Sequence, residues 1–132
     1  MIINLSQEQF QALTEGRKTH LRKPVRPGEY TMPDFSAVMT QTGLIKWQVG
    51  HEYAVRSSED DSQTAFIRIT SIWREQLQEI TGFAARDEGV CPLYEWQYIK
   101  AFAEMWDTLY PRKGTRWADN PLVWVLTFEA VR

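Results

Sequence analysis

The chain has 132 residues, of which 43% are hydrophobic and 24% charged, and its formal net charge is −2. These values exclude a disordered chain and a protein that binds polyanions over its whole surface. One cysteine, Cys91, excludes an intramolecular disulfide, and the two histidines give too few ligands for a His/Cys metal site. We therefore expect one intracellular, cytoplasmic domain spanning residues 1–132, with no metal, no cofactor and no membrane span.

Local signals in the first part of the chain predict a strand, a helix and a second strand. Apolar residues at 2–5 indicate the first strand, and Ser6 with Gln9 three residues later is typical of a capping box. The helix should end at Gly16, because glycine favours the left-handed conformation after a helix. Residues 18–23 then predict a short polar strand entered directly from the helix.

The middle of the chain begins with an irregular stretch and continues with two strands. Prolines and glycines mark residues 24–43 as irregular, with a ribbon around 40–49. Residues 52–56 predict a strand. Residues 64–73 are the clearest strand, because apolar and polar residues alternate there.

The C-terminal half predicts helices followed by a final strand. Residues 74–80 can form a short helix, and residues 81–88 a capped turn that ends at Gly89. The main helix is predicted over 94–110, and its apolar residues at helical spacing are Ile99, Phe102, Trp106 and Leu109. Residues 122–131 begin with an apolar run typical of a strand covered on both faces. This order favours an α+β sheet or small open barrel over a doubly wound fold.

One short segment concentrates the basic residues of the protein. A third of the fifteen lysines and arginines, together with one histidine, lie in residues 16–27, and no acidic residue interrupts them. Its cationic and imidazole side chains are those of Arg17, Lys18, His20, Arg22, Lys23 and Arg26. Such a segment can bind phosphate locally, although a solvated charged face is the simpler interpretation.

Several motifs resemble those of ASCH domains. Gly-Arg-Lys-Thr at 16–19, followed by Arg22 and Lys23, resembles the G-x-K-T-x-T-x-R stretch near the start of that family. Further segments with the same order as in the family lie at 49–56, 67–80, 84–90, 106–110 and 117–125. The last two closely resemble phage- and prophage-encoded members. Residues 29–46 match nothing in the family and are interpreted as an insertion.

The resemblance implies a small PUA-like mixed β-barrel with flanking helices and a cleft beside the first helix that binds RNA. One bacterial branch of the family resembles this chain and hydrolyses N4-acetylcytidine with a lysine, a threonine and a glutamate. Position by position, the lysine is Lys18 and the glutamate is Glu88, whereas the threonine position is Leu21. The amidohydrolase-like site is therefore incomplete. Strict strand alternation would also put Lys18 and Leu21 on opposite faces, unless the chain bends after Gly16.

Three functional hypotheses follow. The leading one is an RNA- or nucleotide-binding module, whose candidate binding residues are Arg17, Lys18, His20, Arg22, Lys23 and Arg56. Trp47, Trp117 and Tyr30 could add base stacking, although core packing is favoured for Trp117. The second hypothesis is an amidohydrolase acting on a modified nucleobase, or a ribonuclease, with Lys18 and Glu88 as the candidate catalytic residues. The third is a protein-interaction domain that contacts its partner through residues 29–46.

Overall fold

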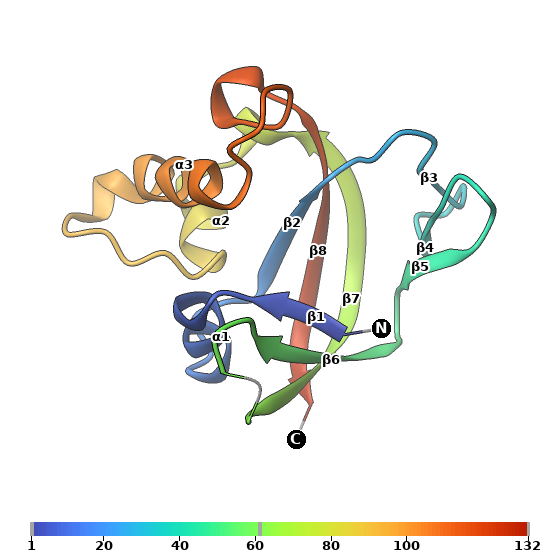
Figure 1. Ribbon diagram of the computed structural model, residues 1–132, viewed down its shortest axis with the longest axis horizontal. Coiled ribbons are helices and arrows are strands. Elements are labelled where there is room, and N and C mark those ends of the chain that lie inside the picture. The colour runs from blue at the N-terminus through green and yellow to red at the C-terminus, as the bar shows by residue number, and fades with distance from the viewer. Residues whose placement is uncertain (1, 61, 132) are drawn as a thin grey trace.

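The computed structural model describes residues 2–60 and 62–131, and its strands form two sheets (Figure 1). The larger sheet has the order β1-β6-β7-β8-β2 and the smaller one the order β3-β4-β5. The strands of the larger sheet are β1 (Ile2–Leu5), β2 (His20–Pro24), β6 (Glu52–Ser57), β7 (Thr64–Gln76) and β8 (Leu122–Val131). Those of the smaller sheet are β3 (Tyr30–Thr31), β4 (Ala37–Met39) and β5 (Ile45–Gln48). β1 pairs with β6 in parallel and the other neighbours are antiparallel, so the larger sheet is mixed.

The larger sheet is bent into an open barrel. β7 pairs with β6 through its first residues and with β8 along most of its length, and its register with β8 shifts between Ile69 and Ser71. Such a bulge increases the bend and twist of a strand, and Figure 1 shows β1 and β6 crossing the direction of β2 and β8. β1 and β2 are the two edges, and within the described part of the chain no ladder joins them. The α+β class and the barrel with flanking helices predicted from the sequence are confirmed.

The helices lie in two places around the sheet. They are α1 (Gln7–Thr14), α2 (Gly82–Asp87) and α3 (Tyr98–Leu109), with short 3₁₀ turns η1 (Leu77–Glu79), η2 (Glu95–Gln97) and η3 (Trp117–Asp119). Figure 1 shows α1 beside β1 and β6, and α2 and α3 together on one side of β2. Ser6 caps α1 as predicted, its Oγ accepting from the backbone N–H of Gln9 at 3.2 Å. The Gln9 side chain does not complete the capping box, because its Nε2 donates to Sδ of Met105.

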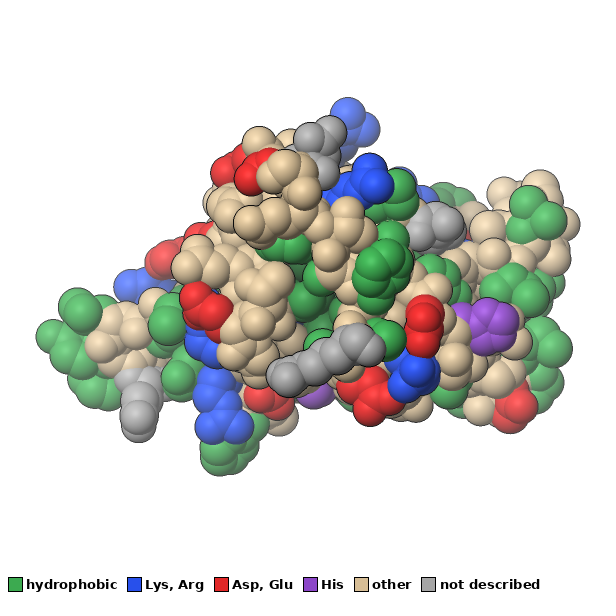
Figure 2. Space-filling model, turned by 90° about the horizontal axis from the view of Figure 1, so that it is seen from below, with side chains coloured by type: hydrophobic (Ala, Val, Ile, Leu, Met, Phe, Trp, Pro, Cys, Tyr) green, Lys and Arg blue, Asp and Glu red, His purple; other side chains and the backbone are tan. Residues whose placement is uncertain are grey.

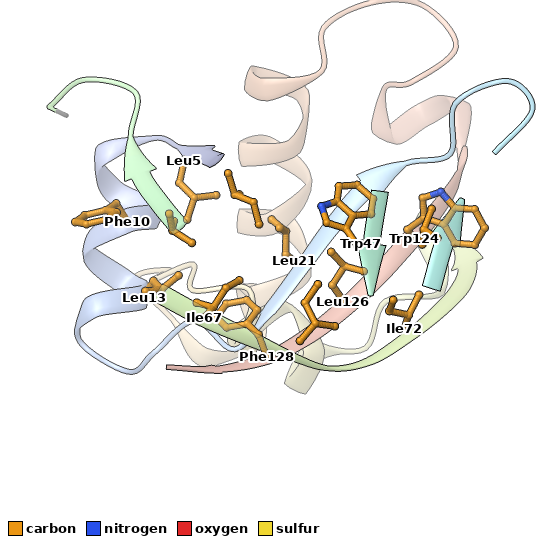
Figure 3. Packing of buried hydrophobic residues seen from close by; sticks show 14 residues of the cluster. Leu5, Phe10, Leu13, Leu21, Trp47, Ile67, Ile72, Trp124, Leu126 and Phe128 are labelled. Atoms are coloured by element: carbon orange, nitrogen blue, oxygen red, sulfur yellow. The ribbon is translucent and has the colours of Figure 1, made fainter. Parts of the chain in front are cut away.

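β8 separates two hydrophobic cores. Trp124, Leu126 and Phe128 point into the barrel, where Figure 3 shows them with Leu21 and the buried Trp47. Val123 and Val125, which alternate with those residues, pack under α2 and α3 with Phe102 and Trp106. The apolar start of this strand is therefore explained by cover on both faces.

Four predictions of local structure are wrong. Residues 24–43, predicted to be irregular, contain β3 and β4, which pair with each other. β7 continues to Gln76, where helix was predicted from 74, because its last residues pair with β8. α3 begins at Tyr98 and not at 94, and Ile99 and Leu109 are 39% and 45% exposed, so only Phe102 and Trp106 of the predicted apolar face are buried.

Charge is evenly mixed over one face of the molecule. Figure 2 shows acidic and basic side chains interspersed on the face seen from below, with hydrophobic side chains both at its ends and in its middle. This agrees with a net charge near zero and shows no extended positive surface on this face. Within residues 2–60 and 62–131, no helix has the length and apolar character needed to cross a membrane.

Candidate functional site

Lys18, Arg22 and Glu88 form a buried cluster of charges. The Lys18 ammonium group donates to the backbone carbonyl of Glu88 at 2.9 Å and lies 3.5 Å from its Oε1. Arg22 donates from NH1 to the other carboxylate oxygen of Glu88 at 2.9 Å. The three residues are only 2%, 3% and 2% exposed, respectively. The structure thus brings together the two candidate catalytic residues and one candidate binding residue.

Glu75 completes this cluster from β7. Its Oε1 accepts from NH2 of Arg22 at 2.6 Å, so the guanidinium group lies between two carboxylates. Two cations and two anions balance, which is the condition under which buried charges are tolerated. Nε of Arg22 is buried and has no hydrogen-bond partner among the residues that the structure describes. One donor of the cluster is therefore unpaired at this position.

Backbone contacts hold Lys18 against the end of α2. The amides of Arg17 and Lys18 both donate to the carbonyl of Ala12 in α1, and the amide of Thr19 donates to the carbonyl of Asp87 in α2. Gly89 makes this approach possible, because its φ is +95° and a Cβ there would lie 2.8 Å from Cβ of Ala12. Only glycine adopts this conformation without strain and leaves the necessary space.

A cavity of about 190 Å³ opens beside the cluster. It lies at the gap between the two edge strands, with α1 on one side and α3 on another. Its lining residues come from β1 and the start of α1 (Asn4, Leu5, Ser6, Gln9), from the basic segment and α2 (Lys18, Leu21, Arg22, Lys23, Glu88), and from α3 and its end (Met105, Trp106, Leu109, Tyr110). The cleft beside the first helix, implied by the family resemblance, is thus present as a real cavity.

The position of β2 at the sheet edge explains how both its faces reach this cavity. Leu21 belongs to the barrel core and Arg22 points to the opposite side, yet both line it. β2 begins only at His20, so Lys18 precedes the strand and strand alternation does not relate it to Leu21. The bend that this requires occurs at Gly16, whose φ is +80°.

Burial controls the protonation of the basic groups around the cavity. Desolvation lowers the pKa of Lys18 below its usual value, although the attraction of the Glu88 carboxylate opposes that change. The pKa of Lys23 is lowered by burial and by the neighbouring charges of Lys18 and Lys46. Burial also raises the pKa of Tyr110 to about 12, so its hydroxyl is a donor and not a base near neutrality.

The remaining predicted site residues are divided between the cavity and other surfaces. Lys23 lines the cavity. His20 lies next to it on β2, where burial lowers its pKa and its ring packs against Trp73. Arg17 is bound to Glu15 and to the carbonyl of Gly89, outside the cavity. Arg56 donates to Thr64 on β7 and does not line the cavity.

The residues considered for base stacking do not form a common platform. Trp47 is 3% exposed and belongs to the barrel core, so its predicted exposure is wrong. Trp117 packs against the core under α2 and α3, as favoured from the sequence. Tyr30 is 45% exposed in the small sheet formed by residues 30–48. That sheet contains most of the segment interpreted as an insertion.

Sequence reasoning did not identify the walls of the cavity that come from α3, nor Glu75. Met105, Leu109 and Tyr110 were assigned to a helix with no functional role, although the helical spacing of 102, 106 and 109 places these residues near one face. Gln9 was interpreted only as a capping residue, yet it lines the cavity and is 3% exposed. The available signal was that Gln9 lies beside Phe10, Ala12 and Leu13 on the face of the helix that is otherwise apolar.

The arrangement supplies charged hydrogen-bonding groups but few groups able to attack a substrate. The hydroxyls that line the cavity are those of Ser6, which caps α1, and Tyr110. At the position of the family's threonine, Leu21 contributes an apolar side chain. In the described part of the chain, no three His, Cys, Asp or Glu residues are grouped in a way that could hold a metal ion. These groups are therefore better suited to hold a polar ligand than to carry out nucleophilic catalysis.

Comparison with known proteins yields similarity at the level of structure. No family model matches the chain, and no curated protein matches its sequence significantly. A crystal structure from Enterococcus faecalis V583, described as family-model DUF984, superposes with a TM-score of 0.59 at 17% identity, covering 93% of this chain and 69% of the other. An ASCH domain from Lactobacillus crispatus JV V101 superposes with a TM-score of 0.55 at 19% identity, covering 98% and 79%.

A third similar structure is an ASCH protein from Zymomonas mobilis, crystallised as a Tyr-to-Phe mutant. Its TM-score is 0.52 at 13% identity, and the match covers 99% of this chain and 71% of the other. The matches span nearly the whole of residues 1–132 and include the β-barrel and its flanking helices. The chain therefore has the ASCH-domain fold.

Proposed function

We propose that this protein binds a nucleotide, free or within single-stranded RNA, by holding one pyrimidine base in the cavity beside Lys18, Arg22 and Glu88. The observation that carries the proposal is the combination of cavity size and buried polar groups. An apolar cavity of about 150 Å³ holds one benzene molecule. The cavity here, of about 190 Å³, accordingly fits one six-membered ring with its substituents and is too small for a whole nucleotide.

The polar groups suit the edge of a pyrimidine. Lys18, Arg22 and Lys23 are donors, and Arg22 has an unpaired Nε. Glu88 is an acceptor whose oxygens each retain capacity beyond the contact already made. Cytosine presents an amino donor together with carbonyl and ring-nitrogen acceptors on one edge. The three cationic donors and the Glu88 carboxylate can together form hydrogen bonds with these groups. A buried site with unpaired polar groups also rejects ligands that lack the matching groups.

The apolar walls provide the other part of the recognition. Leu21, Met105, Trp106 and Leu109 line the cavity. Ligand sites are generally lined by apolar and aromatic side chains with a few polar groups that fix the orientation. A flat base between β2 and α3 would bury its faces against these residues.

Calorimetric titration with cytidine tests the proposal. Leu109 is 45% exposed on α3 and lines the cavity, so Leu109→Trp should obstruct it without disturbing the core. Ile99→Trp is the matched control, because Ile99 is 39% exposed on the same helix and does not line the cavity. We expect the parent and the control to bind cytidine equally and Leu109→Trp to bind at least about tenfold more weakly. Equal binding by all three proteins, or no saturable binding, would refute the proposal.

Hydrolysis of an acylated base is a second candidate function, favoured by one specific observation. Lys18 is a buried amine that contacts a carboxylate and has a lowered pKa, as a general base or nucleophile requires. The chain lacks the threonine of the related amidohydrolases at Leu21. We therefore propose that any such activity is weak and that binding is the principal function.

A further inference from the structure

A second hollow continues from the cavity. This groove has a volume of about 460 Å³, and its lining residues are Pro24, Val25, Arg26, Pro27, Leu109, Tyr110, Pro111, Arg112, Lys113 and Thr115. Leu109 and Tyr110 line both spaces. The cavity is bounded by β2 and the last turns of α3, and the groove by the residues that directly follow each of them. The groove is thus the outward extension of the same site.

The charges in the groove are of one sign. Arg26, Arg112 and Lys113 contribute three cations, and no carboxylate is among the lining residues that the structure describes. None of the three makes a salt bridge in the described part of the chain. The end of α3 lies here too, but a helix C-terminus carries only about half a negative charge. Three positive charges outweigh it, so the groove attracts anions.

The same positive character extends inward from the groove. Lys23 lines the cavity, and its pKa is lowered in part by the nearby charges of Lys18 and Arg26. Lys23 therefore extends the positive charge of the groove to the cavity, where Glu88 and Glu75 balance the charges of Lys18 and Arg22. Prolines at 24, 27 and 111 restrict the backbone on both walls, so the cationic side chains start from fixed positions.

We propose that this groove binds a phosphate group of the nucleotide whose base occupies the cavity, through Arg26, Arg112 and Lys113. The inference rests on the proposed function and adds the subsite for its phosphate, so a phosphorylated nucleotide or an RNA strand should bind more tightly than a free nucleoside. Arginine suits this role because its guanidinium group can donate two parallel hydrogen bonds to phosphate oxygens. The cavity is too small for more than the base, so the sugar and phosphate must leave it, and the groove is the adjoining space.

Calorimetry with three probes tests this site on the full chain: cytidine, cytidine monophosphate (the 5′ and 3′ isomers) and a cytidine-containing hexaribonucleotide. We expect at least one monophosphate to bind about tenfold more tightly than cytidine. The double variant Arg112→Ala with Lys113→Ala should lower the affinity for that monophosphate about tenfold. Both residues are exposed and have no side-chain hydrogen bond in the described structure, so the fold should survive.

The matched control is Arg86→Ala with Lys100→Ala, which removes the same charge from exposed residues that line neither the cavity nor the groove. It should leave monophosphate affinity unchanged. An equal loss in the control would attribute the effect to net charge and would overturn the proposed groove. Cytidine binding with no gain from phosphate would also overturn the groove and leave the base site standing. Absence of binding by every probe would overturn both.

The hexaribonucleotide distinguishes the two sources of phosphate. If the groove binds an RNA strand, the hexaribonucleotide binds more tightly than the monophosphates. The double variant then lowers the slope of log K against log salt by about 1.4, at about 0.7 for each lost phosphate contact. If the groove serves a mononucleotide, the hexamer gains nothing over the better monophosphate. Both results place phosphate in the groove, provided that the double variant weakens binding.

Discussion

The Lys18 ammonium group reaches both the backbone carbonyl of Glu88, at 2.9 Å, and its carboxylate, at 3.5 Å. The other oxygen of the same carboxylate holds Arg22. Glu88 therefore contacts two buried cations, one from the junction between α1 and β2 and one from β2 itself, and Glu75 supplies the second balancing charge. We therefore expect the stability of this part of the fold to depend strongly on the Glu88 side chain.

Replacing Glu88 by glutamine should destabilise the protein strongly. Removing one partner of a buried ion pair leaves an uncompensated charge and typically costs about 3–5 kcal/mol. Urea denaturation would measure the loss. The control is Glu129→Gln. The Glu129 side chain is 55% exposed, and its carboxylate pairs with Arg68, which is 41% exposed. We expect a far smaller effect there, and equal losses would contradict a structural role for the buried cluster.

The stability contributed by Lys18 should increase toward alkaline pH. Its pKa in the folded protein lies below the ordinary value of 10.5, chiefly because of burial. Between these two pKa values the unfolded chain binds a proton that the folded chain does not, so the free energy of unfolding rises with pH in that window. Urea titrations from about pH 7 to about pH 10 should show the parent gaining stability relative to Lys18→Met. A relative loss would mean that the folded protein raises this pKa.

Gly89→Ala should be more destabilising than Gly114→Ala. Both glycines have positive φ values, +95° and +100°, so each substitution incurs backbone strain of about 1–2 kcal/mol. Only at Gly89 would the new Cβ also meet other atoms, those of Ala12 and Lys18 at 2.8 and 3.1 Å. Overpacking of this kind typically adds about 1–3 kcal/mol. Thermal unfolding of both variants measures the difference, and similar melting temperatures would show that α2 does not approach Lys18 as described.

Leu21→Thr should reveal whether Lys18 and Glu88 are positioned to assist hydrolysis once a hydroxyl group is present at residue 21. Leu21 lines the cavity, so a hydroxyl introduced there would reach it. We expect the parent to release little or no cytidine from N4-acetylcytidine, and the variant to show a measurable gain. General acid–base assistance is typically worth about 10²–10⁴-fold. Chromatography of the product, with Leu21→Thr plus Glu88→Gln as the control, checks this.

Two results of that assay would contradict this prediction. Rapid hydrolysis by the parent would show that residues other than those identified here carry out catalysis. Loss of folding in Leu21→Thr, which removes a side chain from the barrel core, is monitored by circular dichroism. A folded variant without any gain would mean that the cavity is built for binding alone.

The sequence predicted those parts of the fold that depend on local signals. Ser6, Gly16, Thr81 and Gly89 mark where α1 and α2 begin and end, and the structure confirms each of them. The positions of Lys18 and Glu88 follow from these boundaries, since Lys18 lies two residues after Gly16 and Glu88 directly precedes Gly89. The strands β1, β6 and β8 were likewise predicted closely from their apolar patterns.

Long-range pairing accounts for what the sequence could not predict. Glu75 and Glu88 lie 53 and 66 positions from Arg22, and no local pattern links them. Arg22 was consequently interpreted as a phosphate ligand, whereas its NH groups are bound to these two carboxylates. The extension of β7 through Gln76 also depends on its partner β8, which overrides the helical tendency of residues 74–76.

The most direct test of the central claim is NMR chemical-shift mapping of the chain with cytidine monophosphate. The account predicts that the largest backbone shifts fall on Lys18, Arg22, Glu88 and residues 109–113, which line the cavity and the groove. Ile99→Trp should give the same map and Leu109→Trp should abolish it. Shifts concentrated on the small sheet of residues 30–48, or at Phe83 and Trp96 on the exposed ends of α2 and η2, would contradict it.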